Sequence, residues 1–289
     1  MNKDATPLER PAALAGRAQL TNDEVQELQR RAERIFKDGR AAFAVGDAVF
    51  LAAFGDLETY ENPNSTASSV WMVGKEFDTR TSLVVDPPDG RIPPRTERAL
   101  ARVAADAERQ RAPAAAEDLG HALRCITYGV PRFSGRYGEV DFSFVQILQT
   151  PDTVVLRLEA VHEARVIPLD GRPHLSPHIR PWGGDSRGHW EGATLVVETT
   201  NFSPQSSFMG AGEHLHLVER FTRVADEVIE YVVTLDDATT WTKPWTVSIR
   251  LKQTPQPIYE FACHEGNYSV EGILAGARAE ESAGAIRAK

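Results

Sequence analysis

Hydrophobic residues recur at helical spacing in the first third of the chain. Thr21 followed three residues later by Glu24 has the pattern of a capping box, and a helix is predicted from there to Gly39. One face of this helix would carry the apolar side chains of Val25, Leu28, Ala32, Ile35 and Phe36. Residues 41–54 are predicted to form a second helix.

A third helix is predicted over residues 95–111, with Pro94 in its first turn, after a loop at residues 61–69. Its apolar stripe is thin and consists of Leu100, Val103, Ala104 and Ala107. Stripes of this width cannot sustain a core alone, so residues 1–144 are predicted to form a helical and extended region that packs on a larger core.

From Val145 onward the chain consists of short runs rich in β-branched residues, separated by turns. Strands are predicted at residues 145–149, 154–160, 165–168, 194–200, 215–224, 228–235, 246–253 and 258–263, after a short extended run at residues 81–85. Strands at hairpin spacing predict a mainly β fold, either an antiparallel β-barrel of the lipocalin or calycin kind or a sandwich, with additional N-terminal helices. The core would span residues 145–274 and leave residues 275–289 as a flexible tail.

The formal net charge of -9 argues against a nucleic-acid partner or an anionic membrane surface, since both require clustered basic residues. The apolar stretch at residues 41–54 contains Asp47 and is shorter than the roughly 20 residues that span a bilayer, so no membrane partner is expected. Because no apolar run follows Met1, a cytoplasmic location is expected, or a periplasmic one if a signal peptide has been removed.

The two cysteines, Cys125 and Cys263, lie far apart in the sequence. Their spacing matches neither a zinc site nor a disulfide-rich scaffold. Two buried thiols and a single bridge in an oxidising compartment both fit this pattern.

Several long motifs resemble those of a largely uncharacterised bacterial family of β-rich proteins. They are IPLDGRPH at residues 167–174, GDSRGHWEG at 184–192, TLVVETTNF at 194–202, TPLERP at 6–11, ERFTR at 219–223 and CHEGNY at 263–268, with a further match at 84–93. The resemblance implies a β-rich protein, exported or cytoplasmic, from bacteria that consume complex organic matter. It assigns no catalytic residue, and the export signal and Gly-Val-Trp segment of many relatives are not present here.

The densest mixture of aromatic, cationic and anionic residues lies between Arg180 and Asn201, around a glycine-rich turn. A histidine, carboxylates and arginines together supply an acid, a base and an anion stabiliser. Candidate catalytic residues are His189, Arg187, Arg180, Asp185, His216 and Arg220, and candidate substrate-binding residues are Trp182, Trp190, Glu198 and Tyr231. The alternative is a structural turn in which the same polar groups bond to the backbone and to each other.

No metal or other cofactor is predicted. His214 and His216 share one face of a predicted strand, as in cupin-type metal enzymes, but Glu219 lies too close for that motif. Ser186 stands in a Gly-x-Ser-x-Gly string without the strand-to-helix context of a nucleophile elbow. The chain contains neither a Walker loop nor a Gly-x-Gly-x-x-Gly after a strand.

The leading hypothesis is therefore a cofactor-independent lyase that cleaves a C–C or C–O bond by acid/base chemistry in a barrel cavity. Its substrate would be an apolar, lignin-derived aromatic small molecule, and retro-aldol loss of formaldehyde is one such reaction. The alternatives are a non-catalytic carrier of an apolar ligand, a cupin-like metal enzyme, or a purely partner-binding protein. A homo-oligomer is compatible with each of them.

Overall fold

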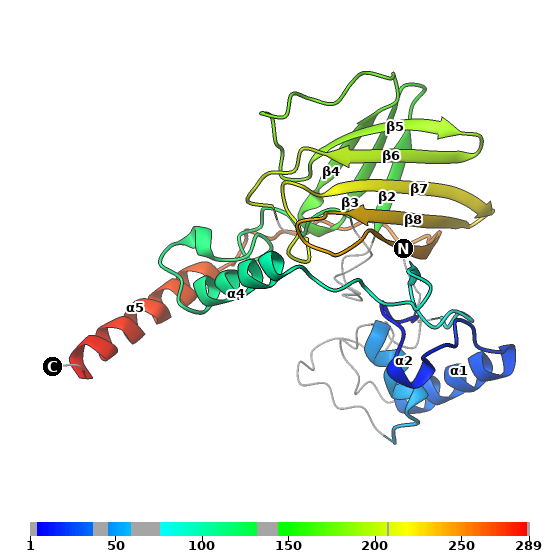
Figure 1. The fold of residues 1–289 in the computed structure, drawn as a ribbon, viewed down its shortest axis with the longest axis horizontal. Helices are drawn as coiled ribbons and strands as arrows, with labels where there is room; N and C mark the ends of the chain where they lie inside the picture. Colours follow the sequence, from blue (N-terminus) through cyan, green and yellow to red (C-terminus); the bar gives the residue numbers. More distant parts are fainter. Residues whose placement is uncertain (1–4, 37–45, 59–75, 132–143, 207, 288–289) are drawn as a thin grey trace.

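A computed structural model describes residues 5–36, 46–58, 76–131, 144–206 and 208–287 (Figure 1). The helices are α1 (Asn22–Phe36), α2 (Gly46–Phe54), α4 (Glu97–Arg111) and α5 (Ser269–Arg287), with short 3-10 turns η1 (Ala12–Leu14), η2 (Ala116–Asp118) and η4 (Ala160–His162). The strands are β1 (Val84–Asp86), β2 (Val145–Gln149), β3 (Thr153–Leu158), β4 (Ala164–Pro168), β5 (Asp185–Glu191), β6 (Thr194–Thr200), β7 (His216–Ala225), β8 (Val228–Asp236) and β9 (Trp245–Lys252). None of the described helices is long and apolar enough to cross a membrane.

The strands form two antiparallel sheets, which confirms the mainly β prediction. One sheet has six strands in the order β1-β9-β8-β7-β6-β5, and the other has three in the order β2-β3-β4. Figure 1 shows the three-stranded sheet behind the larger one. The pairings between described strands do not close a barrel, so barrel closure stays a prediction.

A single hydrophobic core joins the two sheets. Along β7 the side chains alternate, so that Leu217, Glu219 and Phe221 point into the core while His216 and Arg220 point outward. The shared core includes Val154, Leu156 and Ile167 from the smaller sheet and Leu195, Val197, Leu217, Val233, Leu235, Trp245, Val247 and Ile249 from the larger one. The burial of this apolar surface is what holds the two sheets face to face.

The helices follow the predicted pattern with shifted boundaries. The capping box before α1 is present, since the Thr21 N–H donates to Glu24 Oε2 at 2.8 Å and the Glu24 N–H donates to Thr21 Oγ1 at 3.2 Å. Helix α4 begins two residues later than predicted, because Thr96 caps it by accepting from the Ala99 N–H at 3.1 Å. Helix α2 lies within the second predicted helix, whereas the predicted loop at residues 61–69 lies outside the described residues.

The structure corrects three segments in the second half of the chain. Residues 185–191, predicted as a turn, form strand β5 at the edge of the larger sheet and pair with β6. Residues 258–263 form no strand, although they follow β9 after a short segment that contains Pro255 and Pro257. Residues 275–287, predicted as part of a flexible tail, form the last turns of helix α5, as their high alanine content favours.

Helices α1 and α2 pack against each other around a second hydrophobic cluster that includes Leu28, Ile35, Phe36 and Phe50. The extended stretch at residues 76–84 links this cluster to the large sheet. Within that stretch, Arg80 pairs with Gln19 and donates to the Ser248 carbonyl of β9 at 2.8 Å. Whether residues 1–144 depend on the β core for folding stays a prediction.

Candidate functional site

Three of the six predicted catalytic residues, His189, His216 and Arg220, lie on the outer face of the large sheet. The register of β5, β6 and β7 places His189, Glu191, Glu198, His216 and Arg220 on this face, and His189 is 60% exposed. They form surface ion pairs, in which Glu198 contacts His216 at 2.6 Å and Glu191 contacts Arg220. The hydrogen bond from Arg220 lowers the pKa of Glu191 below its usual range. None of these five residues lines the cleft described below.

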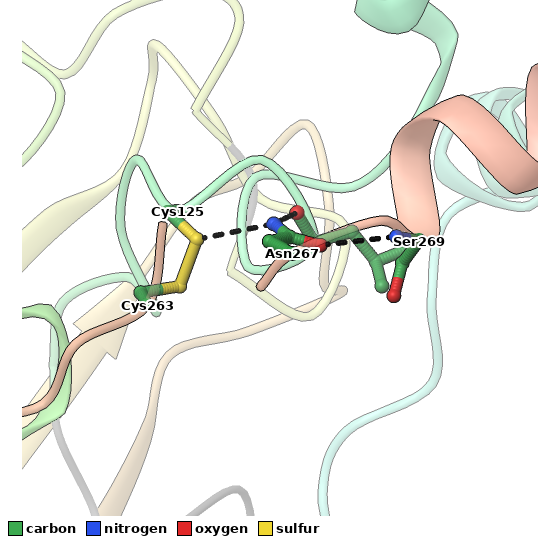
Figure 2. The surroundings of a disulfide bond; sticks show 5 residues. Cys125, Cys263, Asn267 and Ser269 are labelled. Atoms are coloured by element: carbon green, nitrogen blue, oxygen red, sulfur yellow. Dashed lines mark hydrogen bonds between the residues drawn. A yellow bond between two sulfur atoms is a disulfide. The ribbon is translucent and has the colours of Figure 1, made fainter. Parts of the chain in front are cut away.

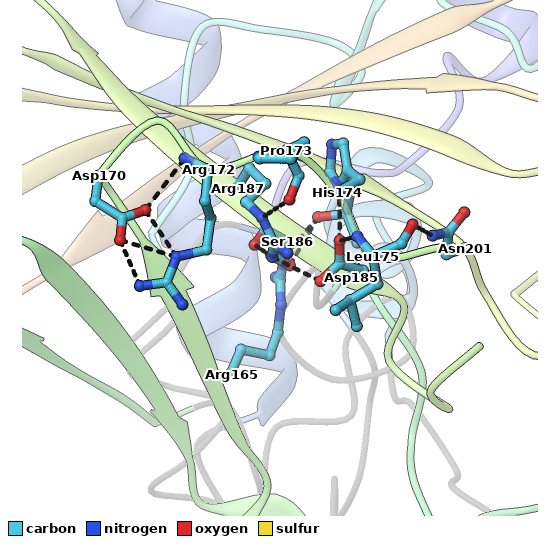
Figure 3. A network of polar contacts seen from close by, with 11 residues as sticks. Arg165, Asp170, Arg172, Pro173, His174, Leu175, Asp185, Ser186, Arg187 and Asn201 are labelled. Atoms are coloured by element: carbon cyan, nitrogen blue, oxygen red, sulfur yellow. Dashed lines mark hydrogen bonds and ion pairs between the residues drawn. The ribbon is translucent and has the colours of Figure 1, made fainter. Parts of the chain in front are cut away.

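At the start of β5, the side chains of Asp185 and Arg187 hold the preceding loop at residues 173–175 in place (Figure 3). Asp185 is buried and accepts from Arg187 Nη1 at 2.6 Å and from the Leu175 N–H at 3.0 Å, while His174 Nδ1 lies 2.8 Å from it. Arg187 also donates to the Pro173 carbonyl. These contacts match the structural alternative for the turn, in which its polar groups bond to the backbone and to each other.

Arg180 and Trp190 also lie outside the cleft described below. The Arg180 guanidinium donates to the backbone carbonyls of Pro177, Phe202 and Glu213. Trp190 is 45% exposed near the end of β5. Trp182 is therefore the one predicted substrate-binding residue that lines the large cleft described below.

The predicted residue Tyr231 belongs to a buried polar network between the two sheets. Arg165 of β4 forms two hydrogen bonds with Glu219 of β7, at 3.0 and 2.6 Å, and Tyr231 donates to Glu219 at 2.7 Å. Ser186 and Thr199 accept from the same guanidinium, each at 3.1 Å.

The pKa values in this network reflect its burial. Burial and the neighbouring Glu219 raise the pKa of Tyr231 well above its usual value, so the phenol stays protonated. Burial opposes the charge of Arg165, but Glu219 outweighs this effect and the pKa of Arg165 is raised. None of these groups lines the cleft described below, and the network connects the two sheets.

A large cleft lies elsewhere, between α4, residues 117–131 and residues 202–206 and 208–215, and has a volume of about 1000 Å³. Its walls combine cations with rings: Arg95, Arg98, Arg102, Arg109 and Arg124, and His121, Tyr128, Trp182, Phe202 and Phe208. The four arginines of α4 and its approach recur at intervals of three, four and seven residues, which places them on one face of the helix. A cleft of this size and composition suits a small molecule that has both apolar and polar parts.

His121 is the titratable ring in this cleft that has a clear electrostatic perturbation. Its ring centroid lies 4.8 Å from that of Trp182, with the two planes tilted by 58°. Burial lowers the pKa of His121, and the positive charge of Arg124 lowers it further. The imidazole is therefore neutral at neutral pH and able to accept a proton.

Several side chains of the cleft are held in place by other groups. Arg95 donates to the Met209 carbonyl, and Arg102 donates to the Gly210 carbonyl and to Thr240 Oγ1. Among the acidic residues, Asp106 pairs with Arg109, Glu213 approaches Arg180, and Asp118 accepts from two backbone N–H groups. Glu117 is exposed and forms no ion pair within the described part of the chain.

A disulfide fixes one wall of the cleft (Figure 2). Cys125, next to Arg124, is bonded to Cys263, so the sequence alternative of a single bridge is the one observed. Asn267 reinforces this joint by donating to the Leu123 carbonyl at 2.9 Å. The short segment that carries His121 and Arg124 is thereby tied to the base of α5.

Sequence reasoning missed His121 and the arginine row of α4. The arginines are visible in the predicted helix, and their spacing places them on one face, where like charges repel each other. This row is the signal that could have pointed to an anion site. His121 follows Gly120 in an irregular segment and has no local pattern. Only the fold brings it to Trp182, which lies 61 positions further along the chain.

Within the described ranges, no group of three or more His, Cys, Asp or Glu side chains is placed to hold a metal ion. The cupin-like alternative requires His214 and His216 to face the same metal ion. The structure separates the two side chains, because His214 lines the cleft while His216 pairs with Glu198 on the outer face. No protein-family model, curated protein or solved structure matches this chain.

Proposed function

We propose that this protein is a cofactor-independent lyase that acts on an aromatic small molecule in the cleft between α4 and residues 117–131, 202–206 and 208–215. The observation that carries the proposal is His121, whose ring lies 4.8 Å from that of Trp182 inside a cleft of about 1000 Å³ and whose pKa is lowered by burial. His121 would act as the base and Trp182 as the platform for the aromatic ring. The arginines of the cleft would stabilise the developing negative charge.

A retro-aldol cleavage suits this set of groups. His121 would take the proton from a hydroxyl group on the carbon next to the bond that breaks. The oxygen electrons form the carbonyl of the released aldehyde, and the electrons of the broken C–C bond move through the adjoining carbon to a conjugated carbonyl of the substrate as an enolate. The arginines stabilise this enolate, and the imidazolium then protonates its carbon. Formaldehyde is the product when the hydroxyl belongs to a terminal CH₂OH group, and the reaction is redox-neutral.

Two alternatives remain in competition with this proposal. The first places catalysis on the outer face of the sheet, with His189 as the acid/base group and Arg187, His216 and Arg220 beside it. The second is a carrier that binds its ligand without turnover. The convergence of a neutral imidazole and several guanidinium groups in one cleft supports an enzyme over a carrier, which needs only one or two orienting groups.

The test is a screen of aromatic alcohols with CH₂OH side chains for aldehyde release, followed by kinetics of His121→Gln. We expect its turnover to fall on the order of 10²-fold to 10⁴-fold, the usual effect of removing a general base. His178→Ala, which alters an exposed histidine outside the cleft, serves as the matched control and should retain activity. Activity lost in His189→Ala but kept in His121→Gln would move the site to the outer face. Ligand binding without turnover of any substrate would favour the carrier.

We also propose that the protein resides in an oxidising compartment such as the periplasm. The Cys125–Cys263 bridge supports this location, because structural disulfides are rare in the reducing cytosol. The resemblance to a family with exported members agrees with it, and membership of that family is part of the proposal. Closure of the two sheets into one barrel-like unit is a further part, supported by the core that they share.

A further inference from the structure

Two cations of the cleft have no described partner. The guanidinium groups of Arg98 and Arg124 form no hydrogen bond or ion pair with any residue that the structure describes. They come from different walls, Arg98 from α4 and Arg124 from the segment fixed by the disulfide. The other arginines of the cleft differ, because Arg95 and Arg102 hold carbonyl groups and Arg109 has an acidic partner.

The position of Arg98 is unfavourable for the helix itself. Arg98 lies in the first turn of α4, where the positive end of the helix dipole disfavours a cation. Arg102 follows four residues later, and like charges at this spacing repel each other. Local helix stability therefore does not account for Arg98, whereas an anionic ligand in the cleft would offset both effects.

The charge of Arg124 also has no described anionic partner, and it lies close to His121. Burial is the larger cause of the lowered pKa of His121, and the charge of Arg124 lowers it further, which places this guanidinium near the ring. An anion bound at Arg124 would then lie close to the imidazole and to Trp182, whose ring centroids are 4.8 Å apart with the two planes tilted.

We propose that the ligand of this cleft carries a carboxylate, which Arg98 and Arg124 bind while its aromatic part lies against Trp182. The chemical class is thus an aromatic carboxylate rather than a neutral aromatic compound. Guanidinium groups suit this role, because they bind carboxylates through paired charge-assisted hydrogen bonds. The inference concerns the cleft of the proposed function, but it is a statement about binding and does not require turnover.

The test compares two probes that differ in charge and hardly in shape, trans-cinnamate and the neutral cinnamamide. Isothermal titration calorimetry with the full-length protein should find cinnamate bound at least about tenfold more tightly at low salt, with the difference shrinking as salt is added. Arg98→Gln and Arg124→Gln should each weaken cinnamate binding about tenfold and leave cinnamamide binding unchanged. Arg111→Gln, on the same helix but outside the cleft, is the matched control and should change neither.

Equal affinity for the two probes, or no binding of cinnamate, would overturn the inference. An equal loss of affinity for both probes in the Arg98 and Arg124 variants would overturn it as well. So would a loss of cinnamate affinity in Arg111→Gln as large as the loss in those two variants. Failure of the lyase proposal is distinguishable, because cinnamate selectivity without any turnover would support the anion site and contradict the enzyme. Turnover of neutral aromatic alcohols without selectivity for cinnamate would support the enzyme and contradict the anion site.

Discussion

The protonation of His121 is set by two neighbouring influences that only the folded chain provides. Burial against Trp182 removes water from the imidazole, and Arg124 adds a positive charge beside it. Both disfavour the protonated ring, so the neutral form persists to lower pH than in a free histidine. A base that acts near neutral pH benefits from such a shift, because it is available over a wider range.

We therefore predict the shape of the pH profile of kcat/KM. Activity should fall as the pH drops, since His121 becomes protonated, and the midpoint of this acidic limb should lie below the ordinary histidine value of 6.5. In Arg124→Gln the charge is removed while the burial remains, so the midpoint should move upward and stay below 6.5. Steady-state kinetics across pH with an active substrate is the measurement. A wild-type midpoint at or above 6.5, or a midpoint that Arg124→Gln leaves in place, contradicts this role of His121.

At the scale of elements, the two sheets are joined by a polar contact as well as by apolar packing. Arg165 of β4 reaches across the core to Glu219 of β7, and Tyr231 of β8 donates a further hydrogen bond to that carboxylate. Gly188 allows β5 to lie close to β4, because a Cβ atom there would come within 2.8 Å of Ile167 and Leu169. The register of these strands thus depends on contacts between different sheets.

We predict that Arg165→Met strongly destabilises the fold, because it leaves Glu219 as a buried charge without its cationic partner. The expected loss of unfolding free energy is about 3–5 kcal/mol, measured by urea denaturation. The control Arg157→Met removes an exposed arginine from the neighbouring strand β3 and should change stability by less than about 0.5 kcal/mol. Adding Glu219→Leu to Arg165→Met should restore part of the loss. Equal stability of the two single variants would show that the buried pair has no structural role.

At the scale of the whole molecule, the disulfide connects parts of the chain that are 138 positions apart. Cys125 precedes all the strands of the smaller sheet, and Cys263 follows the last strand of the larger one. The bridge therefore encloses nearly the whole β region in one covalent loop. In Figure 1, α4 and α5 lie together at one end of the molecule, with α1 and α2 at another.

We predict that Cys125→Ser combined with Cys263→Ser lowers the unfolding free energy by about 2–5 kcal/mol, because the open chain gains conformational entropy on unfolding. Urea denaturation of the oxidised wild type and of the double variant measures this difference. A reducing agent should destabilise the wild type by a similar amount and leave the double variant unchanged. Identical curves for oxidised and reduced wild type would mean that the bridge is dispensable for the fold.

Elements that depend on interactions between residues close together in the sequence were predictable, and elements that depend on distant residues were not. The helix after Thr21 and the hairpin strands β6 to β9 were predictable, since a capping box and alternating side chains act over a few residues. Strand β5 was not, because its glycines favour a turn locally and its pairing with β6 decides otherwise. Among the candidate site residues, Trp182 lies in the cleft, whereas His189 and its neighbours lie on the outer face.

The amino-acid sequence by itself determined that this protein is mainly β, with antiparallel hairpins and N-terminal helices, because local periodicity encodes both elements. It left the pairing of Cys125 with Cys263 open and gave no indication that His121 would meet Trp182. Those contacts join positions far apart along the chain, and a shift of one residue in strand register exchanges the inner and outer faces. Only the tertiary structure decided which polar groups converge, since that depends on how the sheets and α4 pack together.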